Sequence, residues 1–107
     1  MSNIPVSRLA YYIDLATNGA ASDVDLIMKE LNSDVTLAES KFIDYALSLV
    51  NSPEGVERIS EYLFNGSQIQ RNYSTLFYCR RCERGDWDLV KKAFKMGLID
   101  ARQAFSK

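Results

Sequence analysis

The fold is decided by the stretch Gly85-Asp86-Trp87-Asp88-Leu89-Val90-Lys91-Lys92-Ala93-Phe94-Lys95-Met96-Gly97. Its spacing of apolar residues predicts a short amphipathic helix between two glycines. The same pattern occurs twice earlier, over residues 23–31 and 55–63. Three apolar residues anchor the three copies, at intervals of 32 and 31 residues: Val24, Val56 and Trp87. A fixed period of this size is typical of helical-repeat proteins.

Longer helices are predicted between the short ones, because helix-start signals recur at the same interval. Thr36 with Glu39, and Ser67 with Gln70, have the spacing of capping boxes. Asn18-Gly19 offers a left-handed cap that ends the first helix. The predicted long helices begin at intervals of 32, 31 and 32 residues, near Val6, Ala38, Ile69 and Ala101.

Aligning the copies predicts the core, because each column of equivalent positions follows the helical spacing of a buried stripe. The short-helix columns are Val24/Val56/Trp87, Ile27/Ile59/Val90 and Leu31/Leu63/Phe94. The long-helix columns are Val6/Ala38/Ile69/Ala101, Ala10/Phe42/Tyr73/Phe105, Ile13/Tyr45/Leu76 and the small-residue column Ala16/Ser48/Cys79. Trp87 is therefore expected to be largely buried, and Trp87→Ala to lower the free energy of unfolding by about 3–5 kcal/mol.

One helix pair cannot bury such a stripe alone, whereas stacked pairs make a continuous core. We therefore predict an all-α protein, a solenoid of three antiparallel helical hairpins with a period of about 32 residues. A C-terminal half-repeat follows the third hairpin. Residues 1–107 are expected to form a single helical-repeat domain.

The last repeat resembles an ankyrin-type repeat, most clearly over residues 73–100. The segment 73–78 takes the place of that family's Thr-Pro-Leu-His helix start, and 85–90 the place of its Gly-His-Leu-Glu-Ile-Val. Gly97 follows Gly85 at the family's twelve-residue spacing. The resemblance implies stacked helical hairpins and a non-catalytic scaffold that binds proteins. HEAT-like or unclassified helical hairpins fit the pattern almost as well.

Composition is that of a soluble globular chain, with 47% hydrophobic and 25% charged residues. The first five residues have no basic or apolar region typical of a signal peptide. No apolar run approaches the roughly 20 residues of a membrane span. We therefore expect a cytoplasmic protein with no membrane partner.

The side chains that catalysis or metal binding needs are sparse. The chain has no histidine, and no glycine-rich phosphate loop follows a strand-like segment, so neither an enzyme nor a cofactor is expected. Cys79 and Cys82 have zinc-like spacing, but two further ligands are lacking, so no metal site is predicted. Cys79 is interpreted as a packing residue. Three carboxylate pairs fall in first helical turns and are interpreted as caps: Asp23/Asp25, Glu54/Glu57 and Asp86/Asp88.

Tyr11 and Tyr12 are adjacent in the first long helix, and at least one of them is expected to be partly exposed. An exposed tyrosine could contribute to an interface. We favour a role in capping the first repeat, because the outer face of a terminal repeat must meet water.

Charge is unevenly distributed, although the net charge is only −1. Residues 1–65 hold 4 basic and 10 acidic side chains, and residues 66–107 hold 9 basic and 4 acidic ones. Phe77 lies among the basic residues and is expected to be at least partly exposed. The predicted partner-binding residues are Arg71, Phe77, Arg80, Arg81, Arg84, Lys91, Lys92 and Lys95.

Three functions remain open at this point. The first is a small adaptor or inhibitor that binds a protein through its basic C-terminal half. The second is a nucleic-acid-binding protein that uses the same basic residues. The third is a self-assembling protein, whose two halves of opposite charge stack head to tail. An open apolar end around Ala101, Ala104 and Phe105 would contribute to such a homo-oligomer.

Overall fold

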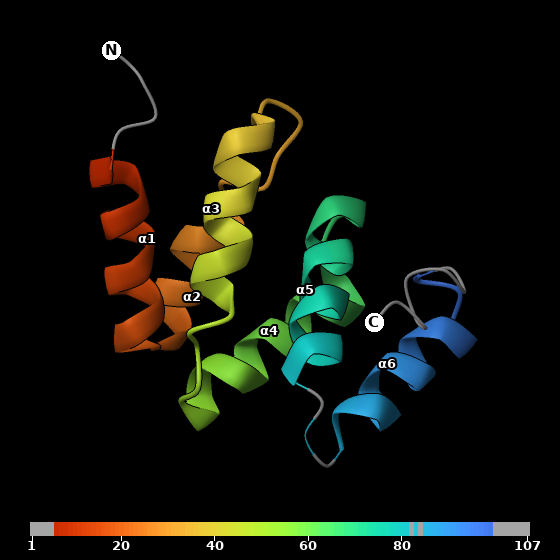
Figure 1. Cartoon of the computed structure of the whole chain (residues 1–107). Coiled ribbons are helices and arrows are strands. Elements are labelled where there is room, and N and C mark those ends of the chain that lie inside the picture. The colour runs from red at the N-terminus through yellow and green to blue at the C-terminus, as the bar shows by residue number, and fades with distance from the viewer. Residues whose placement is uncertain (1–5, 82, 84, 100–107) are drawn as a thin grey trace. The chain divides into compact units, whose positions relative to one another are not determined.

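The structure is a computed structural model, which describes residues 6–81, 83 and 85–99. These residues form six α-helices and no strand, which confirms the all-α class (Figure 1). The helices are α1 (Val6–Asn18), α2 (Ala21–Met28), α3 (Leu37–Leu47), α4 (Pro53–Asn65), α5 (Gln68–Arg81) and α6 (Asp86–Lys95). The predicted half-repeat, from Asp100 onward, lies outside the described residues.

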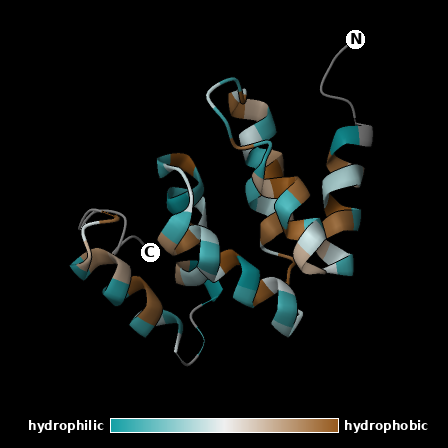
Figure 2. Cartoon of the chain, turned by 180° about the vertical axis from the view of Figure 1, so that it is seen from behind, coloured by the Kyte–Doolittle hydropathy of each residue, from teal (hydrophilic) through white to brown (hydrophobic). Residues whose placement is uncertain are grey.

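The chain divides into two compact units, Met1–Arg58 and Ile59–Lys107. In the first unit, α1 packs against both α2 and α3. In the second, α5 packs against α6. Hydrophilic and hydrophobic residues are interleaved along the helices of both units, as Figure 2 shows. The single repeat domain over residues 1–107 stays a prediction.

Gly19 ends α1 as the sequence predicts, with a φ of 73°. Its position also depends on a close approach, because a Cβ atom here would lie 2.5 Å from Ser52 Oγ. The Ser52 hydroxyl donates a 2.6 Å hydrogen bond to the Gly19 carbonyl and accepts one from the Gly55 amide. These contacts join the α1–α2 turn to the start of α4.

The two predicted capping boxes have different outcomes. Ser67 and Gln70 form both reciprocal bonds, since each backbone amide donates to the other side chain. Thr36 accepts from the Glu39 amide at 3.1 Å. The Glu39 carboxylate, however, accepts from Arg8 on α1 and not from the Thr36 backbone.

The core of the short helices largely follows the predicted columns. Buried members are Val24, Ile27, Leu31, Ile59, Leu63 and Val90. Val56 and Phe94 are half-buried. Trp87 contradicts the prediction, because 43% of its surface is exposed.

In α1, Ala16 is buried as predicted, but the core of α3 and α5 is displaced by one residue from the predicted columns. Tyr45, Ala38, Ala10 and Ser48 are exposed, although each was assigned to a core column. The buried positions of α3 and α5 are instead Ser40, Ile43, Ala46, Leu47, Ser74, Thr75, Phe77 and Tyr78. These helices carry apolar residues on more than one side, so two neighbouring stripes both satisfy the helical spacing. The apolar pattern alone cannot choose between them.

Candidate partner-binding surface

Helix α6 owes its position to the turn that precedes it. Gly85 has a φ of 91°, a left-handed conformation that glycine adopts without the Cβ clash. Val90 and Ala93 are buried on one side of α6, which packs against α5. The opposite side of the helix therefore faces solvent.

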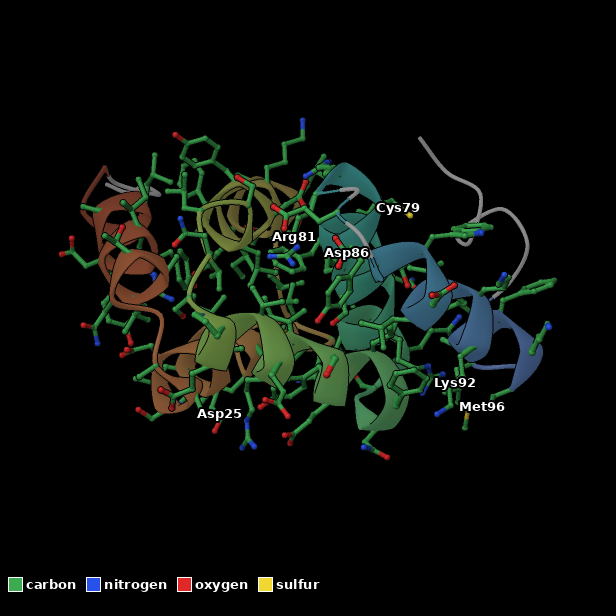
Figure 3. All side chains as sticks on the ribbon, turned by 90° about the horizontal axis from the view of Figure 1, so that it is seen from below. Asp25, Cys79, Arg81, Asp86, Lys92 and Met96 are labelled. Carbon is green, nitrogen blue, oxygen red and sulfur yellow. The ribbon has the colours of Figure 1, made fainter. Side chains whose placement is uncertain are left out.

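Arg81 and Asp86 fix the corner between α5 and α6. Arg81 Nε donates to Asp86 Oδ2 at 3.0 Å, and the Glu83 amide donates to the same oxygen at 2.8 Å. Only 5% of the Asp86 side chain is exposed, so this ion pair is shielded from water on the carboxylate side. Figure 3 shows the two side chains together at this corner. Arg81, predicted to bind a partner, is engaged within the chain.

Arg71 is also held within the chain. Its Nε donates to the Leu98 carbonyl at 2.9 Å, and its Nη1 donates to the Gly66 carbonyl at 2.9 Å. The side chain thereby ties the start of α5 to the segment after α6. A guanidinium that satisfies backbone carbonyls has fewer donors left for a partner.

Phe77 corrects the expectation of an exposed aromatic residue among the basic ones. Only 4% of its surface is exposed, and its ring packs edge-on against Tyr78 with centroids 4.9 Å apart. It occupies the displaced core stripe of α5. Phe77 cannot contact a partner directly.

The solvent-facing side of α6 carries the remaining basic residues. We call it the α6 face, and its exposed residues are Trp87, Asp88, Lys91, Lys92, Lys95 and Met96. A helix turns by about 100° per residue, so Trp87 and Met96 lie at opposite edges of this face and the charged side chains lie between them. Lys92 and Met96 lie on the same side of α6 in Figure 3.

Lys92 makes a contact within the second unit. Its Nζ lies 5.7 Å from the centroid of the Phe64 ring on α4, within the range of a cation–π interaction. Arg80, on α5, is exposed. Arg84 lies outside the described residues. Of the seven predicted residues that the structure describes, four are exposed: Arg80, Lys91, Lys92 and Lys95.

Trp87 and Met96 were missed as surface residues. The sequence pattern predicts Trp87 in the core because it occupies the column of Val24 and Val56. The available signal was its position between Asp86 and Asp88, four residues before Lys91, which suits the edge of a charged face.

Cys79 is half-buried, and Cys82 lies outside the described residues. Within residues 6–81, 83 and 85–99, no group of three or more Cys, Asp or Glu side chains could hold a metal ion. None of the helices there is long and apolar enough to cross a membrane.

A second polar cluster lies in the first unit. The Tyr12 hydroxyl donates to Glu39 Oε2 at 2.6 Å, and Arg8 Nη2 donates to the same oxygen at 2.7 Å. These two donors lower the pKa of Glu39, while burial is the main cause that raises the pKa of Tyr12. The Tyr12 side chain is fully buried, whereas 41% of Tyr11 is exposed, as expected for one of the pair. The cluster joins α1 to α3 and leaves the phenol no access to a ligand.

Comparison of the chain with models of protein families, with curated proteins and with solved structures found no match. The ankyrin resemblance therefore rests on residues 73–100 of this sequence alone.

Proposed function

We propose that the chain is a non-catalytic interaction module that binds an acidic protein surface through the α6 face. The observation that carries the proposal is the exposure of Trp87, at 43%, beside a cluster of lysines. Tryptophan is among the residues most enriched in interface hot spots, because it buries a large rigid area with few rotamers.

The charge of the α6 face selects the partner's chemistry. Lys91, Lys92 and Lys95 are all exposed on it. Their positive potential attracts an acidic surface and speeds its encounter with α6. The indole of Trp87 and the thioether of Met96, which is 57% exposed, supply the apolar contact that charge alone does not.

A protein is favoured over nucleic acid as the partner. Asp88 lies on the exposed side of α6 among the lysines, where its carboxylate can accept hydrogen bonds from amide or hydroxyl groups of a protein. Two of the arginines that could bind phosphate through pairs of hydrogen bonds, Arg71 and Arg81, are bound to groups of the chain itself. Nucleic-acid binding is therefore an outcome to be tested.

The three hairpins are proposed to stack as a solenoid with a period of about 32 residues. Two features support this arrangement: the recurring buried positions of the short helices, and the packing of α1 against α3 in the first unit. Such an array would leave side chains of α6 available to choose the partner.

A pull-down from the native cell lysate, followed by mass spectrometry, tests the proposed function. The bait proteins are the wild-type chain and a variant with Trp87→Ala and Lys95→Glu. A matched control combines Leu26→Ala and Lys29→Glu, which remove an exposed apolar group and reverse an exposed lysine on the first unit. We expect the wild type and the control to retain an acidic protein that the α6 variant loses.

Salt and nucleic acid complete the test. Retention should fall as salt rises from about 50 to 500 mM, because screening weakens exposed charge pairs. A mobility-shift titration with DNA and RNA should show no affinity that depends on Trp87. If the α6 variant retained the acidic protein as well as wild type does, the proposal would be contradicted. Salt-dependent binding of DNA or RNA that Lys95→Glu abolishes would show that the partner is a nucleic acid instead.

A further inference from the structure

The outer side of α3 has an unusual composition for a surface helix. Three of the seven exposed large apolar side chains in the described residues lie on it or in the turn that follows: Leu37 at 73%, Tyr45 at 53% and Leu49 at 37%. Ala38, Lys41 and Ser48 are the other exposed residues of this side. We call these six residues the α3 face. Single exposed apolar residues are common, but an ordered row along one helix indicates an interface.

The order of residues on the α3 face is symmetric about position 43. Leu37 and Leu49 are equally far from it, as are Ala38 and Ser48, and so are Lys41 and Tyr45. Two copies of the helix that pack antiparallel about a two-fold axis bring such equidistant positions opposite each other. Each opposing pair is compatible: leucine meets leucine, a small residue meets a small residue, and lysine meets tyrosine.

The Lys41–Tyr45 pair gives the contact its charge complementarity. An ammonium group over the face of a tyrosine ring is attracted by the ring's negative quadrupole. The symmetry would form this pair twice, once on each side of the axis. A parallel arrangement would instead place lysine against lysine and tyrosine against tyrosine. The pattern therefore selects both the partner and its direction.

We infer that the α3 face is a homodimer interface, in which α3 packs antiparallel against α3 of a second copy of this chain. The face extends over twelve residue steps from Leu37 to Leu49, about 18 Å at the rise of an α-helix. A contact of this length is at the small end of specific interfaces. The dimer is accordingly weak, with a dissociation constant of about 10 μM or higher.

Sedimentation equilibrium over about 5 μM to 1 mM measures the association. We expect the wild type to pass from monomer to dimer within this range. Tyr45→Lys places two lysines opposite each other at both pairs, and should weaken association by about tenfold or more. Because Tyr45 and Lys41 are exposed, the variants should retain the wild-type circular dichroism and melting temperature.

A compensating change tests the antiparallel geometry. Adding Lys41→Tyr to Tyr45→Lys restores a lysine–tyrosine pair across the two-fold axis, so association should recover to within about threefold of wild type. The matched control adds Lys29→Tyr to Tyr45→Lys, which has the same composition but places the tyrosine on another exposed site. This control should stay as weak as Tyr45→Lys alone.

Three results would overturn the inference. One is a wild-type chain that remains monomeric at 1 mM. Another is association that Tyr45→Lys does not weaken, or that Trp87→Ala weakens instead, which would indicate head-to-tail stacking through the second unit. The third is equal recovery with Lys41→Tyr and with Lys29→Tyr, which would indicate non-specific adhesion of exposed aromatic residues.

Discussion

The Tyr12 hydroxyl donates a 2.6 Å hydrogen bond to the Glu39 carboxylate, across 27 positions of the sequence. Arg8 donates to the same oxygen at 2.7 Å and also to the Tyr12 hydroxyl at 2.7 Å. Glu39 belongs to a motif that predicts only a local capping box with Thr36. Its carboxylate instead joins the first two long helices, because a guanidinium is a stronger donor to a carboxylate than a backbone amide.

Removal of the Tyr12 hydroxyl should destabilise the first unit. Tyr12→Phe keeps the buried ring and deletes one donor to an ionised carboxylate, so the free energy of unfolding should fall by about 1.5–3 kcal/mol. Tyr11→Phe is the matched control, since the Tyr11 side chain is 41% exposed and its loss should change the value by less than about 0.5 kcal/mol. Urea denaturation at pH 7 measures both. Equal effects of the two substitutions would contradict the role assigned to Tyr12.

Acid should weaken the same cluster. The pKa of Glu39 is lowered first by the Tyr12 hydrogen bond and then by Arg8. A carboxyl group with a lowered pKa in the folded state stabilises the fold above its unfolded value, about 4.3, and loses that contribution as pH falls through the folded value.

Glu39→Gln tests this pH dependence, because the amide oxygen still accepts from Tyr12 and Arg8 but does not titrate. The wild type should be the more stable protein at pH 7. The difference between the two proteins should shrink as pH falls from about 5 to 2.5, as followed by urea denaturation. A difference that stays constant over this range would show that Glu39 ionisation contributes nothing.

The sequence predicts the buried residues of the short helices better than those of the long helices. In the short helices one apolar stripe stands out against charged residues, so Ile27, Ile59 and Val90 could be placed in the core. In α3, Phe42 and Ile43 are adjacent and both apolar, and the pattern gives no basis for choosing which is buried. That ambiguity is resolved by packing against neighbouring helices, which periodicity does not describe.

The candidate surface shows a related limit. Charge clustering located Lys91, Lys92 and Lys95 correctly on the outside, because lysine is almost never fully buried. Arginine is harder to place, since its fork binds carbonyls and carboxylates of the chain as readily as those of a partner. The charge pattern predicts a partner for Arg71 and Arg81, because their acceptors within the chain, at Leu98 and Asp86, have no signature in the sequence.

Gly19 should tolerate no side chain. Gly19→Ala forces a left-handed residue and also places a Cβ 2.5 Å from Ser52 Oγ, so the free energy of unfolding should fall by about 2–4 kcal/mol. Gly97→Ala is the control for backbone strain alone, because its φ is 78° but no atom of the described residues lies within 4 Å of the added Cβ. It should lower stability by about 1 kcal/mol. Thermal unfolding of both variants distinguishes the clash with Ser52 from the strain of the left-handed backbone. Equal losses of stability in the two variants would show that the clash contributes nothing.

Ser74 should be replaceable at no loss of stability. Its hydroxyl is fully buried and has no hydrogen-bond partner among the described residues. Ser74→Ala removes the penalty of burying an unsatisfied group, so stability should be unchanged or rise by about 1 kcal/mol. Ser40→Ala is the matched control, because the buried Ser40 hydroxyl donates to the Leu37 carbonyl at 2.8 Å. A marked destabilisation by Ser74→Ala alone would show that its hydroxyl has a bound partner, such as a water molecule.

Trp87→Ala should separate stability from binding. The sequence alone predicts a loss of about 3–5 kcal/mol, as for a core tryptophan. Because 43% of Trp87 is exposed, folding removes less apolar area from water than it would for a fully buried tryptophan. Trp87→Ala should therefore lower the free energy of unfolding by about 1–2 kcal/mol. Val90→Ala, at a buried position of the same helix, removes far fewer atoms but should destabilise by a similar amount, because it leaves a cavity. At a temperature where both variants remain folded, only Trp87→Ala should abolish capture of the acidic partner. If Trp87→Ala lowered the free energy of unfolding by 3 kcal/mol or more and left capture of the partner unchanged, Trp87 would be a core residue. The α6 face would then lack the apolar contact that Trp87 is proposed to make.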